Sequence, residues 1–411
     1  MNVATQPVAA PAGECRITSR WPEYAEDEIA AVAEVLRSGR VNALQHGDNC
    51  RAFEQRFAKL CDMPHGIALA NGTLALDLAL KVLGIGPGDE VVVTPRSFVA
   101  SASCISLAGA TPVFADVDPN SQNITAETIA AVLTPRTRAV IAVHLAGWPC
   151  PMEEIMALAA RHGLKVIEDC AQAHGATLNG RPAGSFGDAA AFSFCTDKIM
   201  STGGEGGMLL LRDSDLWARA WSFKDHGKNR DTLMEPVRGN SFRWLHDGIG
   251  TNYRLTEMQA AIGLKQLDKL HKWLAIRARN AGILNEGLAG LNVLRRTLPG
   301  QRVGHAYYKY YAFLRLDQLR EGWDRDRIVA EANVAGIPCF SGTCPEIYRE
   351  KAFAGTASMP AAPLPVAKAM GEESLMLPVD HTLDEAAMQV MSKALREILV
   401  NASLHDGAGG Y

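Results

Sequence analysis

The stretch that decides the fold is VIEDCAQAHGA at Val166–Ala176, followed by AFSFCTDK at Ala191–Lys198 and by the glycine-rich GGEGG at 203–207. The first two segments each begin with a short apolar run that has no polar alternation. Such a run is typical of a strand covered on both faces, as in a parallel sheet. Ligands of open α/β sheets collect outside the carboxyl ends of the strands. The sequence therefore predicts that Asp169 and Lys198, which follow two such strands, lie in one crevice.

Seven apolar runs of this kind alternate with amphipathic helical patterns. They are Gly66–Leu69, Val91–Val93, Pro112–Phe114, Ala139–Val143, Leu164–Ile167, Ala190–Phe194 and Met208–Leu211. The turn sequence Gly86–Asp89 (GPGD) ends a helix that begins near Thr73. This pattern predicts an α/β domain with a mostly parallel seven-stranded sheet sandwiched by helices.

The pattern changes after Gly250. It is helical through 255–270 and beyond, alternates over 305–313 as in a strand, and ends with helices near 325–335 and 383–399. A smaller C-terminal α+β domain is expected here. The predicted division is a disordered arm rich in Ala and Pro, a large domain, a small domain and a flexible tail, at 1–20, 21–270, 271–404 and 405–411.

Composition excludes several classes of protein. The 41 basic and 45 acidic residues are interspersed and give a formal charge of −4, so no basic stripe could follow a nucleic acid. The longest apolar stretch, 68–85, is broken by polar residues and is not a membrane span. The nine cysteines are scattered, with no C-x-x-C, which argues against zinc and fits free thiols. With no secretory signal before Arg16, a cytoplasmic protein is expected.

The polar groups predicted at the crevice are those that pyridoxal phosphate requires. The cofactor needs a lysine for its covalent bond, a carboxylate that keeps the pyridine nitrogen protonated, and hydroxyl or backbone N–H donors for the phosphate. Lys198, Asp169, Ser193 and the glycine-rich loop supply these types of group. Taken singly each has a plainer interpretation, because most loop lysines are solvated and an Asp after a strand usually caps a helix.

Several segments, in this order and spacing, resemble the sugar aminotransferases of the DegT/DnrJ/StrS group. That group lies within the fold type I pyridoxal-phosphate enzymes, the aspartate aminotransferase superfamily. The resemblance runs from about residue 40 to 270 and includes ANGTLAL at 70–76, GIGPGDEV at 84–91, SFVA at 97–100, GATPVFAD at 109–116, VHLAG at 143–147 and GTNYRLT at 250–256.

The resemblance implies a role for each matching residue. Lys198 would carry pyridoxal 5′-phosphate and shuttle a proton, and Asp169 would pair with the pyridinium nitrogen. Gln172 would bond the ring hydroxyl and Phe98 would stack on the ring. The phosphate would be held by Gly72, Thr73 and Ser193, and, in the neighbouring subunit of a homodimer, by the turn that contains Asn252 and Arg254. The Thr73 placement has independent support, since a helix N-terminus attracts anions. Arg96 could meet a phosphate, but a surface position is expected.

The implied reaction moves an amino group from glutamate or glutamine to a keto-sugar, with a nucleotide-linked sugar as first choice and a free keto-sugar or keto-cyclitol as second. Two rivals remain. A sugar dehydratase on the same scaffold carries histidine in place of the lysine, so Lys198 argues against it. A regulatory protein would bind the cofactor without turnover, which the complete set of Lys198, Asp169 and Gln172 disfavours. The acceptor is not fixed, because 337–344 reads IPCFSGTC where many relatives have a tract with histidine and proline.

Overall fold

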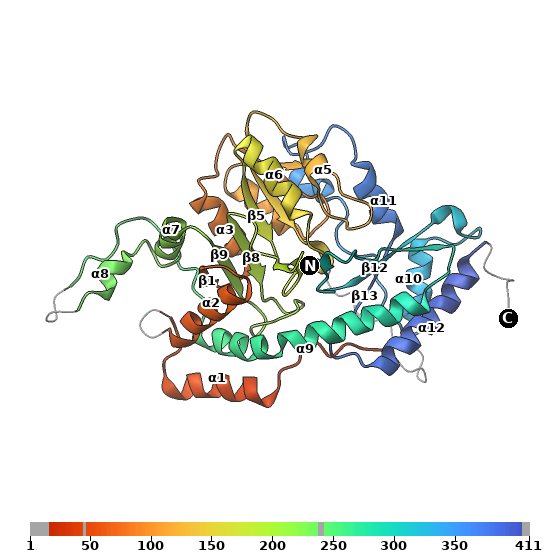
Figure 1. Cartoon of the computed structure of the whole chain (residues 1–411), viewed down its shortest axis with the longest axis horizontal. Helices are drawn as coiled ribbons and strands as arrows, with labels where there is room; N and C mark the ends of the chain where they lie inside the picture. The colour runs from red at the N-terminus through yellow and green to blue at the C-terminus, as the bar shows by residue number, and fades with distance from the viewer. Residues whose placement is uncertain (1–15, 44–46, 237–241, 405–411) are drawn as a thin grey trace.

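The centre of the molecule is one seven-stranded sheet with the order β1-β9-β8-β5-β4-β2-β3 (Figure 1). The structure is a computed structural model that describes residues 16–43, 47–236 and 242–404. Only β9 runs against both of its neighbours, and the other pairs are parallel. The strands are β1 (His65–Leu69), β2 (Glu90–Val93), β3 (Thr111–Phe114), β4 (Thr137–Val143), β5 (Lys165–Asp169), β8 (Ala189–Ser193) and β9 (Gly207–Leu211). All seven predicted strands and the mostly parallel sheet are confirmed.

Helices cover both faces of this sheet, because alternate residues of its buried strands point to opposite sides. One face packs against α3 (Gly72–Val82), α4 (Ala100–Leu107) and α7 (Ser214–Lys224). The other face packs against α2 (Asp48–Leu60), α5 (Ala126–Ala130) and α6 (Met152–His162). The short helix α8 (Arg230–Met234) projects away from the body at one end of the molecule (Figure 1).

A second, smaller sheet forms the C-terminal part, with the order β10-β12-β13. Its strands and helices are β10 (Leu294–Arg296), β12 (Tyr310–Leu314), β13 (Ser374–Leu377), α10 (Arg325–Val334), α11 (Pro365–Glu373) and α12 (Glu385–Ala402). A third, small sheet pairs β11 (Val303–Gly304), which follows β10, with β6 (Thr177–Leu178) and β7 (Arg181–Pro182), which lie between β5 and β8 in the sequence. Short 3-10 turns occupy Leu145–Gly147, Leu316–Gln318, Ile347–Arg349 and Lys351–Phe353.

The long helix α9 (Glu257–Gly287) runs along both parts and packs on α1 (Glu26–Ser38), α2 and α12 (Figure 1). The predicted boundary at 270/271 falls inside this single helix, and the division into two domains stays a prediction. Residues 16–20, assigned to a disordered arm, hydrogen-bond to the C-terminal part: Ile17 N donates to Gly336 O at 3.0 Å. The rest of the predicted arm, 1–15, and the tail, 405–411, lie outside the described residues.

The alternating run at 305–313 is a strand only in its second half. The N–H groups of Ala306 and Tyr308 donate to the carbonyls of Gly147 and Ala146 at 2.9 Å, and Tyr307 has φ +47°. The prediction of a strand over the whole run was wrong, because its first half docks on the loop after β4. Among the helices that the structure describes, none has the length and apolar content needed to cross a bilayer.

Candidate active site

Asp169 is the last residue of β5 and lies at the carboxyl edge of the large sheet, as predicted. Its side chain is buried and accepts hydrogen bonds from Ser101 Oγ at 2.7 Å and from Ala171 N at 3.1 Å. Burial raises the pKa of the Asp169 carboxyl. The two hydrogen bonds and the charge of Lys198 lower it only in part. A buried carboxylate in this state is stabilised by a cationic partner.

Lys198 follows β8, which is the parallel neighbour of β5, so Lys198 and Asp169 both lie at the carboxyl edge of the sheet. The charge of Lys198 also lowers the pKa of the Asp169 carboxyl. Its Nζ is 3.3 Å from Asp197 Oδ1 and 5.1 Å from the centre of the Tyr308 ring. Trp21 Nε1 donates to the Lys198 carbonyl at 2.7 Å, and Tyr308 Oη donates to Asp197. The lysine is therefore held at its backbone and flanked at its tip by one carboxylate and one ring.

The predicted phosphate residues meet where α3 begins. Asn71 caps this helix, its Oδ1 accepting from Leu74 N at 3.0 Å. A Cβ added to Gly72 would lie 2.6 Å from the Ser193 Cβ, so only glycine lets the helix start approach that serine so closely. The first-turn N–H groups have no partner inside the helix, and Thr73 is exposed there. Together with the Ser193 hydroxyl they form a cradle of donors suited to an anion.

Gln172 and Phe98 lie near this edge. Gln172 Oε1 accepts from Ala146 N at 2.7 Å, which leaves its Nε2 as the group that can donate to a ring oxygen. Phe98 is 47 % exposed in the loop between β2 and α4, next to Ser97, whose hydroxyl is 3.1 Å from that of Ser101. Its exposure suits a ring that stacks on a ligand better than the core position typical of phenylalanine.

Arg96, for which a surface position was expected, is fully buried in the loop between β2 and α4. The expectation was wrong, because β13 of the C-terminal part covers this loop. Arg96 Nη2 donates to Ser374 Oγ at 3.0 Å, and its Nε donates to Gln122 Oε1 at 2.8 Å. Arg96 therefore joins the two parts of the fold.

The turn with Asn252 and Arg254 lies beside the end of β1 in its own chain, where Ala70 N donates to Tyr253 O at 2.9 Å. Arg254 forms an ion pair with Asp225, and Asn252 is exposed. The contact of this turn with the phosphate of a second subunit stays a prediction.

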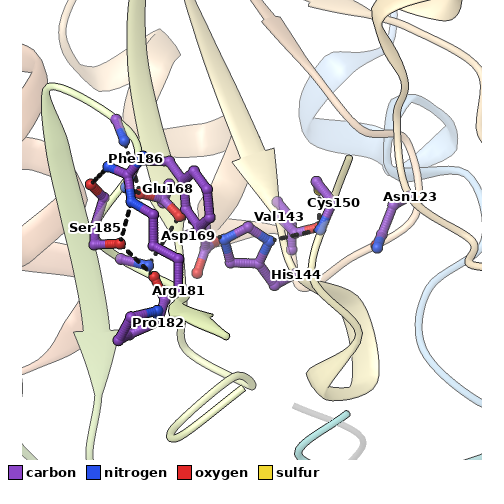
Figure 2. Close-up of polar contacts among 12 residues, drawn as sticks. Asn123, Val143, His144, Cys150, Glu168, Asp169, Arg181, Pro182, Ser185 and Phe186 are labelled. Carbon is purple, nitrogen blue, oxygen red and sulfur yellow. Dashed lines mark hydrogen bonds and ion pairs between the residues drawn. The ribbon is translucent and has the colours of Figure 1, made fainter. Parts of the chain in front are cut away.

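Directly behind Asp169, a buried network joins Glu168 to His144 (Figure 2). His144 Nε2 lies 3.0 Å from Glu168 Oε2, and its Nδ1 accepts from Cys150 N at 2.9 Å. Glu168 also accepts three backbone N–H bonds of 2.7 to 2.8 Å, from Gly184, Phe186 and Gly187. The ligand atoms of His144, Glu168 and Cys170 lie within 4.8 Å of one another, the spacing of a metal site. Because both ring nitrogens and both carboxylate oxygens are already bonded, a hydrogen-bonded network explains the cluster better than a metal.

These groups fit pyridoxal phosphate. The buried carboxylate suits a pyridinium N–H, the free Gln172 amide suits a ring oxygen, and the glycine-dependent cradle beside Ser193 suits a phosphate. Sequence reasoning missed three side chains of this site. Ser101 could have been found, since it lies in the first turn of the helix that follows Phe98. Trp21 and Tyr308 come from distant segments that carry no local signal.

The fold and this site define a pyridoxal-phosphate enzyme of fold type I. The model of the DegT/DnrJ/EryC1/StrS aminotransferase family matches residues 22–396. The chain is 39 % identical over 351 residues to GDP-perosamine synthase of Caulobacter vibrioides, covering 85 % of this chain and 89 % of that protein. It is 37 % identical over 353 residues to a UDP-N-acetyl-3-dehydro-α-D-glucosamine 3-aminotransferase of Acidithiobacillus ferrooxidans, covering 86 % and 89 %.

A solved structure shows the same fold. The chain is 48 % identical to the aminotransferase from Psychrobacter cryohalolentis, with a TM-score of 0.92 over 94 % of this chain and 100 % of that one. The chain belongs to the DegT/DnrJ/EryC1/StrS aminotransferase family, and it is a pyridoxal-phosphate-dependent aminotransferase.

Proposed function

We propose that this enzyme transfers an amino group from glutamate or glutamine to a nucleotide-linked keto-sugar. The names of two relatives, a GDP-perosamine synthase and an aminotransferase of a UDP-linked dehydro-glucosamine, support a nucleotide-linked acceptor. The observation that carries the chemistry is the placement of Asp169 and Lys198 at one edge of the sheet, next to the cradle at Gly72.

The proposed mechanism assigns one task to each side chain. Pyridoxal phosphate, when bound, supplies an electron sink that makes a C–H bond of the substrate acidic. Lys198 Nζ would hold the cofactor between turnovers, and as a free amine it would be the base that takes a proton from the donor's α-carbon and the acid that gives it back. Asp169 would keep the proton on the ring nitrogen, and Gln172 Nε2 would donate to the ring oxygen. Trp21 fixes the Lys198 carbonyl, so that the lysine swings from a fixed backbone.

The phosphate would be held by the first-turn N–H groups at Gly72 and Thr73 and by the Ser193 hydroxyl. Phe98, which is 47 % exposed, would stack on the ring. These placements support a site whose walls come from several loops at the carboxyl edge of the sheet, as in other open α/β folds.

We further propose a homodimer in which Asn252 and Arg254 reach the phosphate of the other subunit. Two large apolar side chains that shortly precede this turn in the sequence are exposed, Trp244 at 87 % and Ile249 at 94 %. Exposed apolar groups of this size mark association surfaces. Light scattering of the purified protein should give twice the mass of the 44.2 kDa chain.

The proposed location is the cytoplasm. The eight described cysteines are free, and six of them are buried. Free thiols in this number suit a reducing compartment.

The function is tested by two half-reactions observed through the cofactor's visible band. Glutamate or glutamine should bleach the band, and keto-sugar nucleotides, screened on the resulting pyridoxamine form, should restore it. Lys198→Ala is the control that should do neither. If only free keto-sugars or keto-cyclitols restore the band, the acceptor is one of these compounds and not a nucleotide-linked sugar. A band that no amino donor bleaches would favour a regulatory protein.

A further inference from the structure

Asp197 directly precedes Lys198, and its carboxylate lies at the tip of the lysine side chain. Consecutive residues of a helix or a strand do not face each other. Here a turn, closed by the hydrogen bond from Lys198 N to Cys195 O at 3.0 Å, brings the two side chains together. Lys198 Nζ is 3.3 Å from Asp197 Oδ1 and 3.4 Å from Asp197 Oδ2. Among the described carboxylates, Asp197 alone forms an ion pair with Lys198.

Tyr308, from the C-terminal part of the chain, holds this carboxylate. Its Oη donates to Asp197 Oδ2, and the centre of its ring is 5.1 Å from Lys198 Nζ. Burial raises the pKa of the Tyr308 hydroxyl well above its ordinary value, and the charge of Asp197 adds to the shift. The hydroxyl therefore keeps its proton and can donate it to the carboxylate.

The backbone around Tyr308 is fixed by three hydrogen bonds. Tyr308 N donates to Ala146 O at 2.9 Å. The buried Arg277 donates its Nη1 to the carbonyls of Tyr307 and Tyr308 at 3.2 and 3.3 Å. Tyr307 has φ +47°, a left-handed conformation that residues other than glycine seldom adopt. Such a conformation persists only where the surroundings impose it, as they do here, and it is found most often at functional sites.

The Asp197 carboxylate is ionised at neutral pH. Desolvation tends to raise its pKa, but the charge of Lys198 and the hydrogen bond from Tyr308 outweigh this effect and lower the pKa below its ordinary value. An ionised carboxylate this close to an amine favours the ammonium form over the neutral form. The Lys198 side chain is only 14 % exposed, so little water is available to stabilise the charge in place of Asp197.

Lys198 must become positively charged during the proposed aminotransferase reaction, on which this inference rests. When the Cα–H bond of the donor breaks, its electron pair stays with the donor carbon and the proton adds to the lone pair of Lys198 Nζ. The ammonium ion then gives the proton back and becomes a neutral amine again. We propose that Asp197, held by Tyr308, is the counter-ion of Lys198 in its charged state and lowers the barrier to this proton transfer. Both are positioning residues, because they act through Lys198 and not on the substrate.

The first test uses the enzyme loaded with pyridoxamine phosphate, in which the Lys198 amine is free. Acetic anhydride in limiting amount reacts with neutral amines and not with ammonium ions, and peptide mapping by mass measures the label on Lys198. We expect labelling of Lys198 at neutral pH to be about three- to tenfold faster in Asp197→Asn than in the wild type, because the carboxylate that favours the ammonium form is gone. Tyr308→Phe keeps the ring and removes the Oη donor, so a smaller increase is expected.

Glu372→Gln is the matched control for this labelling. It removes a carboxylate that forms an ion pair with Lys368 at the surface, and it changes the charge of the chain by the same amount as Asp197→Asn. The labelling of Lys198 should be unchanged in this variant. If Asp197→Asn is also labelled at Lys198 at the rate of the wild type, the proposal is overturned.

The second test separates this role from a structural one. The bleaching of the cofactor's visible band is followed in a single turnover, with saturating donor that carries either hydrogen or deuterium at the α-carbon. Asp197→Asn should bleach about three- to tenfold more slowly than the wild type. Its isotope effect should equal or exceed that of the wild type, because the slowed step is the one that breaks the C–H bond. A slower reaction with a smaller isotope effect would mean that another step is impaired, and it would overturn the proposal.

Failure of the proposed function gives a different result. If no amino donor bleaches the band of the wild type, the aminotransferase reaction is wrong and the role of Asp197 in proton transfer falls with it. Normal bleaching of Asp197→Asn together with unchanged labelling overturns the role of Asp197 alone. Should Asp197→Asn fold poorly, Tyr308→Phe carries both tests, and wild-type labelling and bleaching in that variant would contradict the proposal.

Discussion

Glu168 and Asp169 are consecutive residues of β5, but their carboxylates have different hydrogen-bond donors and opposite pKa shifts. Glu168 is surrounded by donors of its own chain, namely His144 and three backbone N–H groups. Burial would raise the pKa of Glu168, but these donors outweigh it and lower that pKa. Among the described residues, Asp169 has only Ser101 and Ala171 as donors, and burial raises its pKa.

The difference follows from the alternation of a strand, which sends successive side chains to opposite faces. The Glu168 face is closed by the loop at 184–187, so the chain itself completes the hydrogen bonds of the carboxylate (Figure 2). The Asp169 face opens to the site, so its carboxylate is left for a cation from outside. One acid therefore stabilises the fold, and its neighbour is the one that we propose for the cofactor.

Asp169→Asn should have the largest effect on activity. The loss of the charge that keeps the ring nitrogen protonated should lower kcat by about 10²–10³-fold or more. The cofactor-free protein should be as stable as the wild type or more so, because a poorly solvated carboxylate is removed. Steady-state kinetics and urea unfolding check the two halves of this prediction. Near-normal turnover of Asp169→Asn would contradict the proposed role of Asp169 at the cofactor.

Glu168→Gln should show the reverse pattern. We expect the free energy of unfolding to fall by about 2–4 kcal/mol, since a charged acceptor of four hydrogen bonds becomes neutral. Turnover per folded molecule should change far less than in Asp169→Asn. A variant that unfolds like the wild type but loses turnover would place Glu168, and not Asp169, at the cofactor.

The two variants should also differ from the wild type in a pH-dependent way. The folded pKa of Glu168 is lowered, so its stabilising effect is present above the ordinary value of 4.5 and is lost as the pH falls through the folded pKa. The stability lost in Glu168→Gln should therefore become smaller toward acid pH.

For Asp169 the folded pKa is raised from 3.8, so its charged form destabilises the cofactor-free protein as the pH rises. The stability gained in Asp169→Asn should therefore also become smaller toward acid pH. Unfolding curves between about pH 3 and pH 7 measure both trends. A stability difference from the wild type that stays constant over this pH range would contradict the pKa shifts of Glu168 and Asp169.

Ser101→Ala should have the smallest effect. It removes the 2.7 Å hydrogen bond to Asp169 Oδ2, which lowers the pKa of that carboxyl. A loss of about tenfold in turnover is expected for a bond to a charged group. Ser106→Ala, on the same helix and exposed, is the matched control. Equal kinetics for the two variants would mean that Ser101 does not support Asp169.

The large sheet and the polar residues at its edge could be predicted from the sequence, for a physical reason. Strands buried on both faces are unbroken apolar runs, and the polar residue after such a run must lie at the strand end, as Asp169 does. The cap at Asn71 is likewise a local feature, because its side chain accepts from Leu74 N three residues on. The close approach of Gly72 to Ser193 joins segments far apart in the sequence and could not be inferred in this way.

The parts that the sequence did not predict depend on contacts between distant segments. The docking of 305–309 on the loop after β4 is one such contact, and it turns the expected strand into an irregular segment. The burial of Arg96 by Ser374 and Tyr311 is another. Trp21 and Tyr308 reach Lys198 in the same way. Side chains of this kind look like ordinary surface or core residues until the two parts of the fold are brought together.

The central claim is that Lys198 bonds to the cofactor whose ring nitrogen Asp169 faces. The most direct measurement is reduction of the cofactor-loaded enzyme with borohydride, followed by digestion and mass mapping of the labelled peptide. We expect the pyridoxyl label on Lys198 in the wild type and no label in Lys198→Ala. A label on any other lysine, Lys309 included, would contradict it.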